Sequence, residues 1–343
     1  MLPADGPLAD DLAAAGIEVL VQPLAVLRRE LLSAPGLSGL LAAALRDAVA
    51  LRRLIRQRDV ALVHSNTSVV LAGAAAARGA AVPHVWHVRE IYSRFGRAWP
   101  LYRRVLASAS ALPCVSAAAA KQFRPTDPAR VVHDGLAVQP VRVGREEARA
   151  ALDLPVERPL VAVLGRISDW KGQDLMVRAL AEPPLRERDV IGLLAGEAWP
   201  GAEDRLQRVL DLAVALGVRD RLWLLGFRDD VGAVYGAADV IAVPSTEPDP
   251  LPGAAIEAAA AGCAVVASDH GGLPEIIRAD ETGLLVAPRD ATALANAIAL
   301  LLDDPARRER LGAAAARDVR ERFAPQLLLR ELQALYDAVL VSR

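Results

Sequence analysis

The sequence predicts an α/β protein of two domains, each built around a parallel β-sheet. A chain of 343 residues is too long for a single hydrophobic core and is typical of two domains of about 100 to 200 residues each. Hydrophobic residues make up 53% of the chain but aromatic residues only 4%, so alanine, leucine and valine supply most of the apolar surface. That mixture is typical of helices packed on parallel strands.

The clearest pattern begins near residue 155, where short apolar runs alternate with helical patterns. We expect strands at residues 160–164, 190–195, 222–225, 240–243, 264–267 and 284–286. We expect helices at residues 173–181, 203–216, 231–237, 254–261, 273–279 and 291–302. Repeated βα units of this kind predict a complete Rossmann-like domain.

The first 140 residues predict a second α/β domain with a weaker pattern. We expect strands at residues 17–21, 60–64, 85–87 and 111–115, separated by alanine-rich helices, and a helix at 8–15. The apolar strand and glycine turn that normally open such a domain are expected to be missing. Prolines in residues 138–158 predict a linker with a short helix, and leucines at helical spacing predict a closing helix over 325–340. The expected domains are therefore 1–140 and 141–324, followed by the closing segment 325–343.

Charge and cysteine content exclude several classes of partner and compartment. Forty basic and forty-two acidic residues give a formal charge of -2, so no positive field is available to hold nucleic acid. Cys114 and Cys263 lack metal-type or redox spacing, which predicts two separate buried thiols in a reducing compartment. Acidic residues near the start, and the lack of any apolar run of about 18 residues, predict a protein of the cytoplasmic side.

Several common catalytic motifs are missing from the sequence. It contains no G-x-G, no G-x-x-x-x-G-K-[ST] and no G-x-S-x-G, which argues against dehydrogenases, P-loop NTPases and α/β-hydrolases. It also contains no D-x-D and no H-E-x-x-H, so we predict no catalytic metal.

The first positive motif is Gly165-Arg-Ile-Ser-Asp-Trp-Lys-Gly172, which follows the expected strand 160–164. Open α/β sheets bind ligands at the carboxyl ends of their strands. Arg166 and Lys171 could converge there on a diphosphate, the arginine through its fork and the lysine as a point charge. A solvated pair of basic residues on a surface loop is the alternative.

Two further loops follow expected strands in the same way. Glu257 lies near the start of the expected helix 254–261, whose free amides favour a phosphate, and it could bind hydroxyl groups of a ligand. Alternatively it only stabilises the helix dipole. Gly271 and Gly272 follow the strand 264–267 and allow the backbone to approach a ligand, although ordinary turn chemistry explains them equally well.

The order of these motifs, G-R-x-x-x-x-K-G, then a loop comparable to E-x7-E, then D-x-G-G-x-P-E, resembles the retaining GT-B glycosyltransferases of the large bacterial family 4. That family includes phosphatidylinositol mannosyltransferases and glycosyltransferases of capsule and lipopolysaccharide synthesis. The resemblance implies two Rossmann-like domains facing across a cleft, with a nucleotide-diphospho-sugar on the C-terminal one. It implies that Arg166 and Lys171 hold the diphosphate, Glu257 the ribose and Phe227 the base. The other donor-binding residues that it implies are Asp249, Leu251, Gly253, Ala254, Gly271 and Gly272.

The sequence departs from this pattern in the sugar-binding loop. Asp249 stands where the E-x7-E pattern has its first glutamate, and Pro252 stands where the family usually has glycine. Because proline has no N–H to donate, we expect a reshaped loop. The sequence does not identify the donor sugar.

In the first domain, residues 84–90 resemble the family's segment in which a histidine faces the transferring sugar, and His87, at the end of the expected strand 85–87, is the better match. A packed or capping histidine is the alternative. Asn66, Arg89 and Glu90 are expected on the acceptor side of the cleft.

A cluster of aromatic and basic residues suggests contact with an anionic membrane, with an acceptor sugar or with the domain itself. The aromatic members are Trp86, Tyr92, Phe95, Trp99 and Tyr102, interleaved with Arg89, Arg94, Arg97, Arg103 and Arg104. The basic helical stretch 40–58, with Arg46, Arg52, Arg53 and Arg56, adds to the membrane hypothesis, although a solvated helix face is the commoner explanation.

The resemblance implies transfer of a hexose-type sugar from a nucleotide-diphosphate donor to a glycan or lipid-linked acceptor, with retention of configuration and without a metal. His87, Arg166 and Lys171 are the expected catalytic residues. Two alternatives remain: a sugar-nucleotide epimerase of related fold, and a truncated or degenerate member that binds nucleotide or a partner without turnover.

Overall fold

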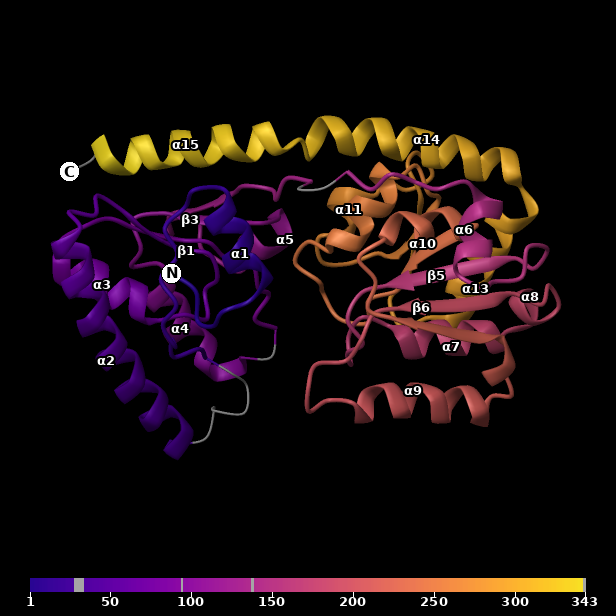
Figure 1. Cartoon of the computed structure of the whole chain (residues 1–343), viewed down its shortest axis with the longest axis horizontal. Helices are drawn as coiled ribbons and strands as arrows, with labels where there is room; N and C mark the ends of the chain where they lie inside the picture. The colour runs from indigo at the N-terminus through magenta and orange to yellow at the C-terminus, as the bar shows by residue number, and fades with distance from the viewer. Residues whose placement is uncertain (28–33, 94, 137–138, 342–343) are drawn as a thin grey trace. The chain divides into compact units, whose positions relative to one another are not determined.

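A computed structural model describes residues 1–27, 34–93, 95–136 and 139–341 of the chain (Figure 1). The chain divides into two compact units. Unit 1 comprises Met1–Val115, Ala119–Val132 and Glu331–Arg343, and unit 2 comprises Ser116–Ala118 and His133–Arg330. Each unit is described separately.

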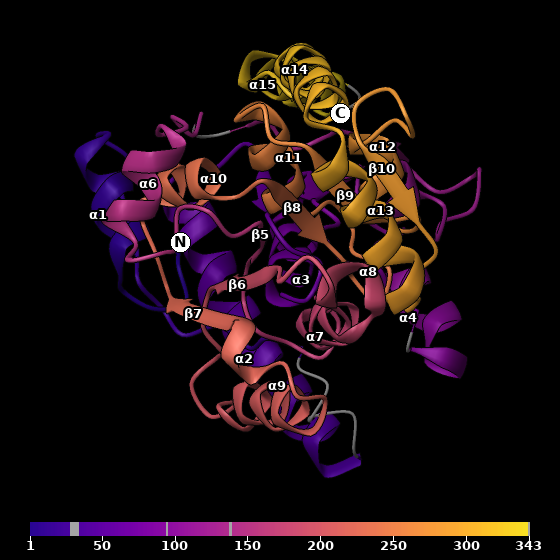
Figure 2. The same ribbon diagram turned by 90° about the vertical axis from the view of Figure 1, so that its right-hand side faces the viewer.

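Unit 2 is built on a six-stranded parallel sheet in the order β10-β9-β8-β5-β6-β7 (Figure 2). Its strands are β5 (Leu160–Leu164), β6 (Ile191–Ala195), β7 (Leu222–Gly226), β8 (Val240–Val243), β9 (Val265–Ser268) and β10 (Leu284–Val286). The order reverses beside β5, which pairs with both β6 and β8. That reversal is the switch point at which open α/β sheets bind ligands.

Helices cover both faces of this sheet, as Figure 1 shows for α10 and α11 on one side of β5 and β6 and for α7 and α9 on the other. One core packs Leu160 and Ala162 against the first group, and the other core packs Val161 and Val163 against the second. This alternation follows from the two-residue period of a strand. The first group is α6 (Arg145–Ala151), α10 (Val231–Ala237), α11 (Gly253–Ala260), α12 (Leu273–Ile276) and α14 (Pro305–Arg322). The second is α7 (Gln173–Ala181), α8 (Pro183–Arg186), α9 (Asp204–Ala215) and α13 (Ala291–Asp303).

The structure confirms all six strands expected from the sequence in unit 2, within one residue at each end. The six expected helices are also present, although α12 is shorter than expected because Ile277 takes an extended conformation. α6 is the short helix expected in the linker, whose first residue, 138, lies outside the described residues. The sequence did not predict α8 or α14.

Unit 1 contains two pairs of short parallel strands. β1 (Val63–Ser65) pairs with β2 (His84–Trp86), and β3 (Leu112–Cys114) pairs with β4 (Ala129–Val131). Single bridges, such as Val85 to Ala111, connect the two pairs. The helices of this unit are α1 (Pro7–Ala14), α2 (Ala34–Gln57), α3 (Ala72–Ala80) and α4 (Trp99–Leu106), and α5 (Ala117–Ala120) contains residues of both units.

One strand expected in unit 1 is wrong. Residues 17–21 form no strand, and Val21 makes only an isolated bridge to Leu2. Ile17 and Val21 are about half exposed, so no second layer covers this apolar run. The helix expected at residues 8–15 is confirmed by α1, whereas β4 was not predicted.

The expected closing helix is confirmed as α15 (Pro325–Val341). Its last residues, from Glu331, belong to unit 1, where Leu335 and Tyr336 pack against Val85 and Ala111. Within the described ranges, no helix combines the length and apolar character needed to cross a bilayer.

Candidate active site

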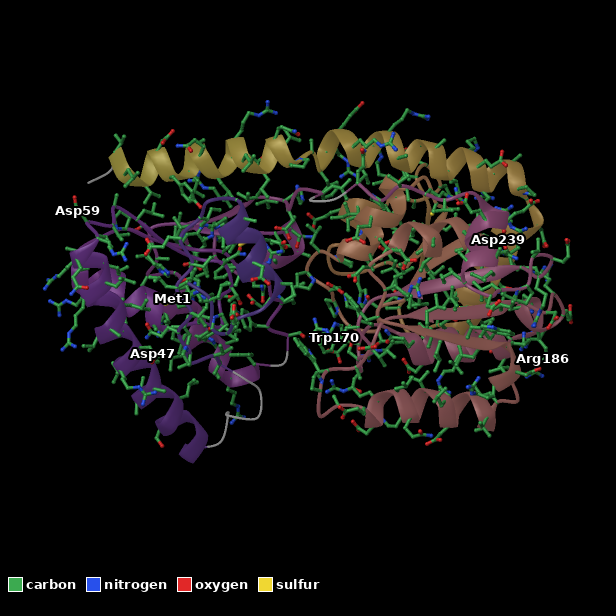
Figure 3. All side chains as sticks on the ribbon, in the orientation of Figure 1. Met1, Asp47, Asp59, Trp170, Arg186 and Asp239 are labelled. Atoms are coloured by element: carbon green, nitrogen blue, oxygen red, sulfur yellow. The ribbon has the colours of Figure 1, made fainter. Side chains whose placement is uncertain are left out.

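The candidate site of unit 2 lies on the loops that follow its strands at their carboxyl ends. Figure 3 labels Trp170 at this edge, and Arg186 and Asp239 at the opposite one. Trp170 lies in the β5–α7 loop, and its carbonyl oxygen accepts a hydrogen bond of 2.8 Å from the amide of Thr246 in the β8–α11 loop. The loop that carries Arg166 and Lys171 is therefore hydrogen-bonded to the loop that carries Asp249.

Glycines allow these loops to pack backbone against backbone. Gly172 has φ +82°, and a Cβ atom there would lie 2.6 Å from the carbonyl carbon of Pro244. A Cβ atom on Gly271, which has φ +61°, would lie 2.7 Å from the amide nitrogen of Asp249. Such distances and dihedral angles exclude other side chains. The glycines of the first and third motifs therefore hold the β8–α11 loop between them.

The two expected diphosphate-binding cations have different surroundings. Lys171 Nζ lies 2.6 Å from Oδ2 of Asp249, a buried carboxylate. Arg166 is exposed, and within the described residues its guanidinium makes no ion pair or hydrogen bond. Partial desolvation by the neighbouring loops, followed by the charge of Arg205, lowers the pKa of Arg166, while Asp249 raises it. An arginine at such a site still remains charged.

Glu257 lies on the first turns of α11 and accepts a 3.0 Å hydrogen bond from the hydroxyl of Tyr235. Burial raises the pKa of Glu257, and the Tyr235 hydrogen bond opposes that shift. At the start of the helix, the amides of Gly253 and Ala254 have no hydrogen-bond acceptor within the described residues. A carboxylate and two free amides therefore lie within one helical turn of each other.

Buried serine hydroxyls without a hydrogen-bond partner mark the same edge of the sheet. They belong to Ser168 and Ser245, in the loops that follow β5 and β8, and to Ser268, the last residue of β9. The nearby His270 donates from Nε2 to the carbonyl oxygen of Ser245 at 2.8 Å, so that nitrogen carries the proton. Orphaned buried polar groups are rare in proteins, and here they gather where the motifs predict a ligand.

The loop after β6 adds Glu197 and Trp199, which the motifs did not indicate, beside Phe227, which was expected near the base. Phe227, which is 67% exposed, donates its amide to Oε1 of Glu197 at 3.3 Å. The carbonyl oxygen of Glu197 accepts a hydrogen bond from the amide of Ile167. Trp199 lies two residues further on, and its ring centroid is 4.4 Å from Cζ of Arg166. Only the position of Glu197 and Trp199 after a strand could have indicated them from the sequence.

In unit 1, His87 follows β2 and is buried, with Nε2 unpartnered. Its ring stacks on that of His64 with centroids 5.5 Å apart, and Nδ1 of His64 is hydrogen-bonded to the hydroxyl of Tyr336. Burial lowers the pKa of His87 to about 3 and that of His84 to about 4. These two histidines are therefore neutral at physiological pH, and His87 keeps one ring nitrogen available.

Glu90 braces a loop of unit 1. Its carboxylate accepts hydrogen bonds from the hydroxyls of Thr67 and Ser68, and from the amide of Arg89 at 3.0 Å. Burial and, second to it, the charge of Arg89 lower the pKa of His87. Asn66 is exposed in the same loop. Asn66, Arg89 and Glu90 thus lie in neighbouring loops, and the hydrogen bonds of Glu90 stabilise these loops.

The aromatic cluster packs within unit 1. The ring of Tyr92 lies 4.7 Å from that of Phe95, 5.1 Å from that of Trp99 and 5.3 Å from that of Tyr102, measured between centroids. Trp86 is fully buried. Of the interleaved arginines, Arg103 is buried against Asp127, and Arg94 lies outside the described residues. These contacts favour packing on the domain over contact with a membrane.

The two cysteines are free and buried, as expected. Burial raises the pKa of Cys114 to about 12 and that of Cys263 to about 11. Among the described residues, no three histidine, cysteine or acidic side chains form a group that could hold a metal ion.

Comparison with known protein families identifies the chain. The family model described as glycosyl transferases group 1 matches residues 144–318, more than half of the chain, and the model of glycosyltransferase family 4 matches residues 8–139. The chain belongs to the group 1 glycosyl transferases. The resemblance found in the motifs is therefore confirmed.

Curated relatives of this group 1 chain match over only part of their length. The D-inositol 3-phosphate glycosyltransferase of Corynebacterium efficiens is 38% identical over 198 residues, which cover 56% of this chain and 45% of that protein. The protein of the same name from Salinispora tropica is 36% identical over 196 residues, which cover 55% and 40%. The matched part therefore spans less than half of these relatives.

Solved structures of similar fold match almost the whole group 1 chain. The Anabaena protein HepE, crystallised with UDP and glucose, has a TM-score of 0.80 at 25% identity, covering 97% of this chain and 90% of that one. A sucrose-phosphate synthase from Thermosynechococcus elongatus has the same TM-score and identity, covering 98% and 92%. The fold is GT-B, as the sequence predicts.

Proposed function

We propose that this chain transfers a hexose-type sugar from a nucleoside-diphosphate donor to a glycan or lipid-linked acceptor on the cytoplasmic side of the membrane, with retention of configuration and without a metal. The observation that carries the proposal is the set of loops at the carboxyl ends of β5, β6, β7, β8 and β9. They bring Arg166, Lys171 and the free amides of α11 to the edge where such sheets bind ligands. The similar HepE structure was solved with UDP, which supports a nucleotide as ligand of this chain.

The chemistry of the leaving group assigns a role to each candidate site residue of unit 2. As the glycosidic bond breaks, the departing diphosphate gains charge while the sugar becomes oxocarbenium-like. Arg166 and Lys171, with the amides of Gly253 and Ala254, would stabilise that charge in place of a metal. Glu257 would accept hydrogen bonds from the ribose hydroxyls, and Phe227 would lie beside the base.

The sugar itself would lie against the β8–α11 and β9–α12 loops. Their backbones are held together by the hydrogen bond from the amide of Gly272 to the carbonyl oxygen of Asp249, at 2.8 Å. Asp249 and Leu251 would line this subsite with Gly271, and His87 of unit 1 would orient the sugar with its neutral ring. Asn66, Arg89 and the loop that Glu90 holds would meet the acceptor. In this reaction the leaving phosphate oxygen takes the acceptor proton on the same face, so no protein nucleophile is required.

A thermal-shift panel with UDP, GDP and ADP, each with and without EDTA, tests donor binding. A nucleotide at 100 times its Kd adds about 2.7 kcal/mol to the free energy of unfolding. We expect one nucleotide to raise the melting temperature by several degrees, unchanged by EDTA. No shift from any nucleotide would refute the proposal.

Turnover is then tested with the sugar conjugate of that nucleotide. Release of free nucleotide only when an acceptor extract is added supports a transferase. Interconversion of the donor sugar without nucleotide release supports an epimerase instead, and binding without either reaction supports a non-catalytic member.

We also propose that the outer face of α2 contacts an anionic membrane, where lipid-linked acceptors reside. Leu41, Leu45 and Val49 recur at every fourth position and are each more than half exposed. Arg52 and Arg53 follow on the next turn and are exposed, and the one acidic residue of α2, Asp47, is buried and accepts a hydrogen bond from the amide of Ala25. Apolar side chains bordered by unopposed arginines fit an anionic lipid surface.

Sedimentation with phosphatidylcholine vesicles, with or without phosphatidylglycerol, tests this contact. Each arginine near such a surface contributes about 1 kcal/mol, so R52Q/R53Q should weaken binding to the anionic vesicles roughly 30-fold. The control R310Q/R317Q removes the same charge from exposed positions on α14 and should leave binding unchanged. Equal binding of both vesicle types would refute the membrane contact.

A further inference from the structure

Arg166 stands out among the cations of unit 2 because its only described side-chain partner is an aromatic ring. Its Cζ atom lies 4.4 Å from the ring centroid of Trp199. Lys171 is bound to Asp249, and Arg205 and Arg208 both bind Asp169. The charge of Arg166 is therefore held in place without being neutralised.

The backbone fixes this arrangement. The loops after β5 and β6 continue the strand pairing, with the amide of Ile167 donating to the carbonyl oxygen of Glu197 at 2.9 Å and a parallel bridge from Ile167 to Ala198. Gly196 has φ +145°, and a Cβ atom there would lie 2.7 Å from the carbonyl carbon of Gly165. This close approach sets the residues that precede and follow the bridge, Arg166 and Trp199, beside each other.

An aromatic partner and a carboxylate partner have different consequences for anion binding. The face of an indole ring attracts a guanidinium group but carries no net charge. A carboxylate would neutralise the arginine and would have to be displaced before a diphosphate could bind. Trp199 is 57% exposed, so its ring borders the open edge of the site.

We propose that Trp199 is a positioning residue for the donor diphosphate: its ring holds the guanidinium of Arg166 in a binding-ready orientation and leaves its charge available. This inference rests on the proposed function, in which Arg166 binds the diphosphate. It predicts that Trp199 contributes to binding of UDP through Arg166, and little to binding of UMP, which lacks the second phosphate.

The test is calorimetric titration of the whole chain with UDP and UMP. W199L should weaken UDP binding about three- to tenfold and W199F much less, because phenylalanine keeps an aromatic face. The matched control is W223L, which removes a second described arginine–tryptophan contact of unit 2, between Trp223 and Arg158, at the amino-end edge of the sheet. W223L should leave UDP binding unchanged.

A double-mutant cycle with R166Q separates an effect through Arg166 from direct stacking on the base. If Trp199 acts through Arg166, W199L should have no further effect in the R166Q background. An equal loss in both backgrounds, or an equal loss for UMP and UDP, would assign Trp199 to the base and overturn the inference. Unchanged UDP binding by W199L would also overturn it. Failure of the wild-type chain to bind any nucleoside diphosphate would instead refute the proposed function.

Discussion

Replacing Gly172 with alanine should disrupt the junction between the loop that carries Arg166 and Lys171 and the loop that carries Asp249. The residue has φ +82°, and left-handed backbone costs a residue with a Cβ atom about 1–2 kcal/mol. The new Cβ atom would also lie 2.6 Å from the carbonyl carbon of Pro244 and closer still to its oxygen. Overpacking of this kind costs about 1–3 kcal/mol, so G172A should lower the free energy of unfolding of unit 2 by about 2–5 kcal/mol.

Alanine substitutions at two other glycines of unit 2 separate the backbone cost from the overpacking cost. Gly217 has φ +66° but open space around its Cβ position, so G217A should cost only the backbone term of about 1–2 kcal/mol. Gly144 has an ordinary φ of -59° and open space. G144A should lose about 0.5–1 kcal/mol as an N-cap and regain about 0.4–1 kcal/mol from the stiffer unfolded chain, so its net effect should be only a few tenths of a kcal/mol.

The assay is thermal unfolding of the three variants beside the wild-type chain. A loss of 2–5 kcal/mol corresponds to a fall of about 10 °C in the melting temperature of a domain of this size. G172A should also lose nucleotide binding, because the loop must move to accept the methyl group. If G172A had the same melting temperature as G217A and bound nucleotide normally, the close packing of the two loops would be wrong.

Three further outcomes are expected. D249N should tighten UDP binding about fivefold, or ~1 kcal/mol, by freeing Lys171, and yet slow sugar transfer, whereas weaker UDP binding in a titration would contradict the pairing. The buried His84 and His87 stay neutral while the unfolded chain binds protons below pH about 6.5. The free energy of unfolding of unit 1 should therefore fall by about 1.4 kcal/mol per pH unit for each histidine from pH 6.5 towards 4, measured by urea unfolding, and H87Q should reduce that slope. E275A should destabilise unit 2 by about 2 kcal/mol in the same assay, because Glu275 accepts hydrogen bonds from the amides of Ala117 and Ala118, and E275Q should cost less.

The fold of unit 2 could be predicted because its strands are buried on both faces and therefore stand out as continuous apolar runs. β5 has the bounds expected from the sequence. α14 was missed because arginines surround its narrow buried stripe of Leu311, Ala315 and Val319. Its start carries a recognisable cap, since the side chain of Asp304 accepts from the amide of Arg307 and Pro305 follows at the first helical position.

The site was predictable where chain order alone sets position. A loop that follows a parallel strand must reach the same edge of the sheet, which is why Arg166, Asp249 and Gly271 were expected together. The contact between Arg166 and Trp199 was not predictable, because it depends on the register of two neighbouring loops. The packing of Tyr92 against Phe95 and Trp99 was likewise hidden, since aromatic residues close in sequence are typical of both surfaces and cores.

The central claim is that unit 2 binds a nucleoside diphosphate through Arg166. Calorimetric titration of wild-type and R166A chains with UDP and GDP, in the presence of EDTA, tests it most directly. The account predicts that one of the nucleotides binds the wild-type chain and that R166A loses about 10- to 100-fold in affinity, because a hydrogen bond to a charged group contributes about 1.5–3 kcal/mol. Equal binding by R166A, or no binding of either nucleotide to the folded wild-type chain, would contradict it.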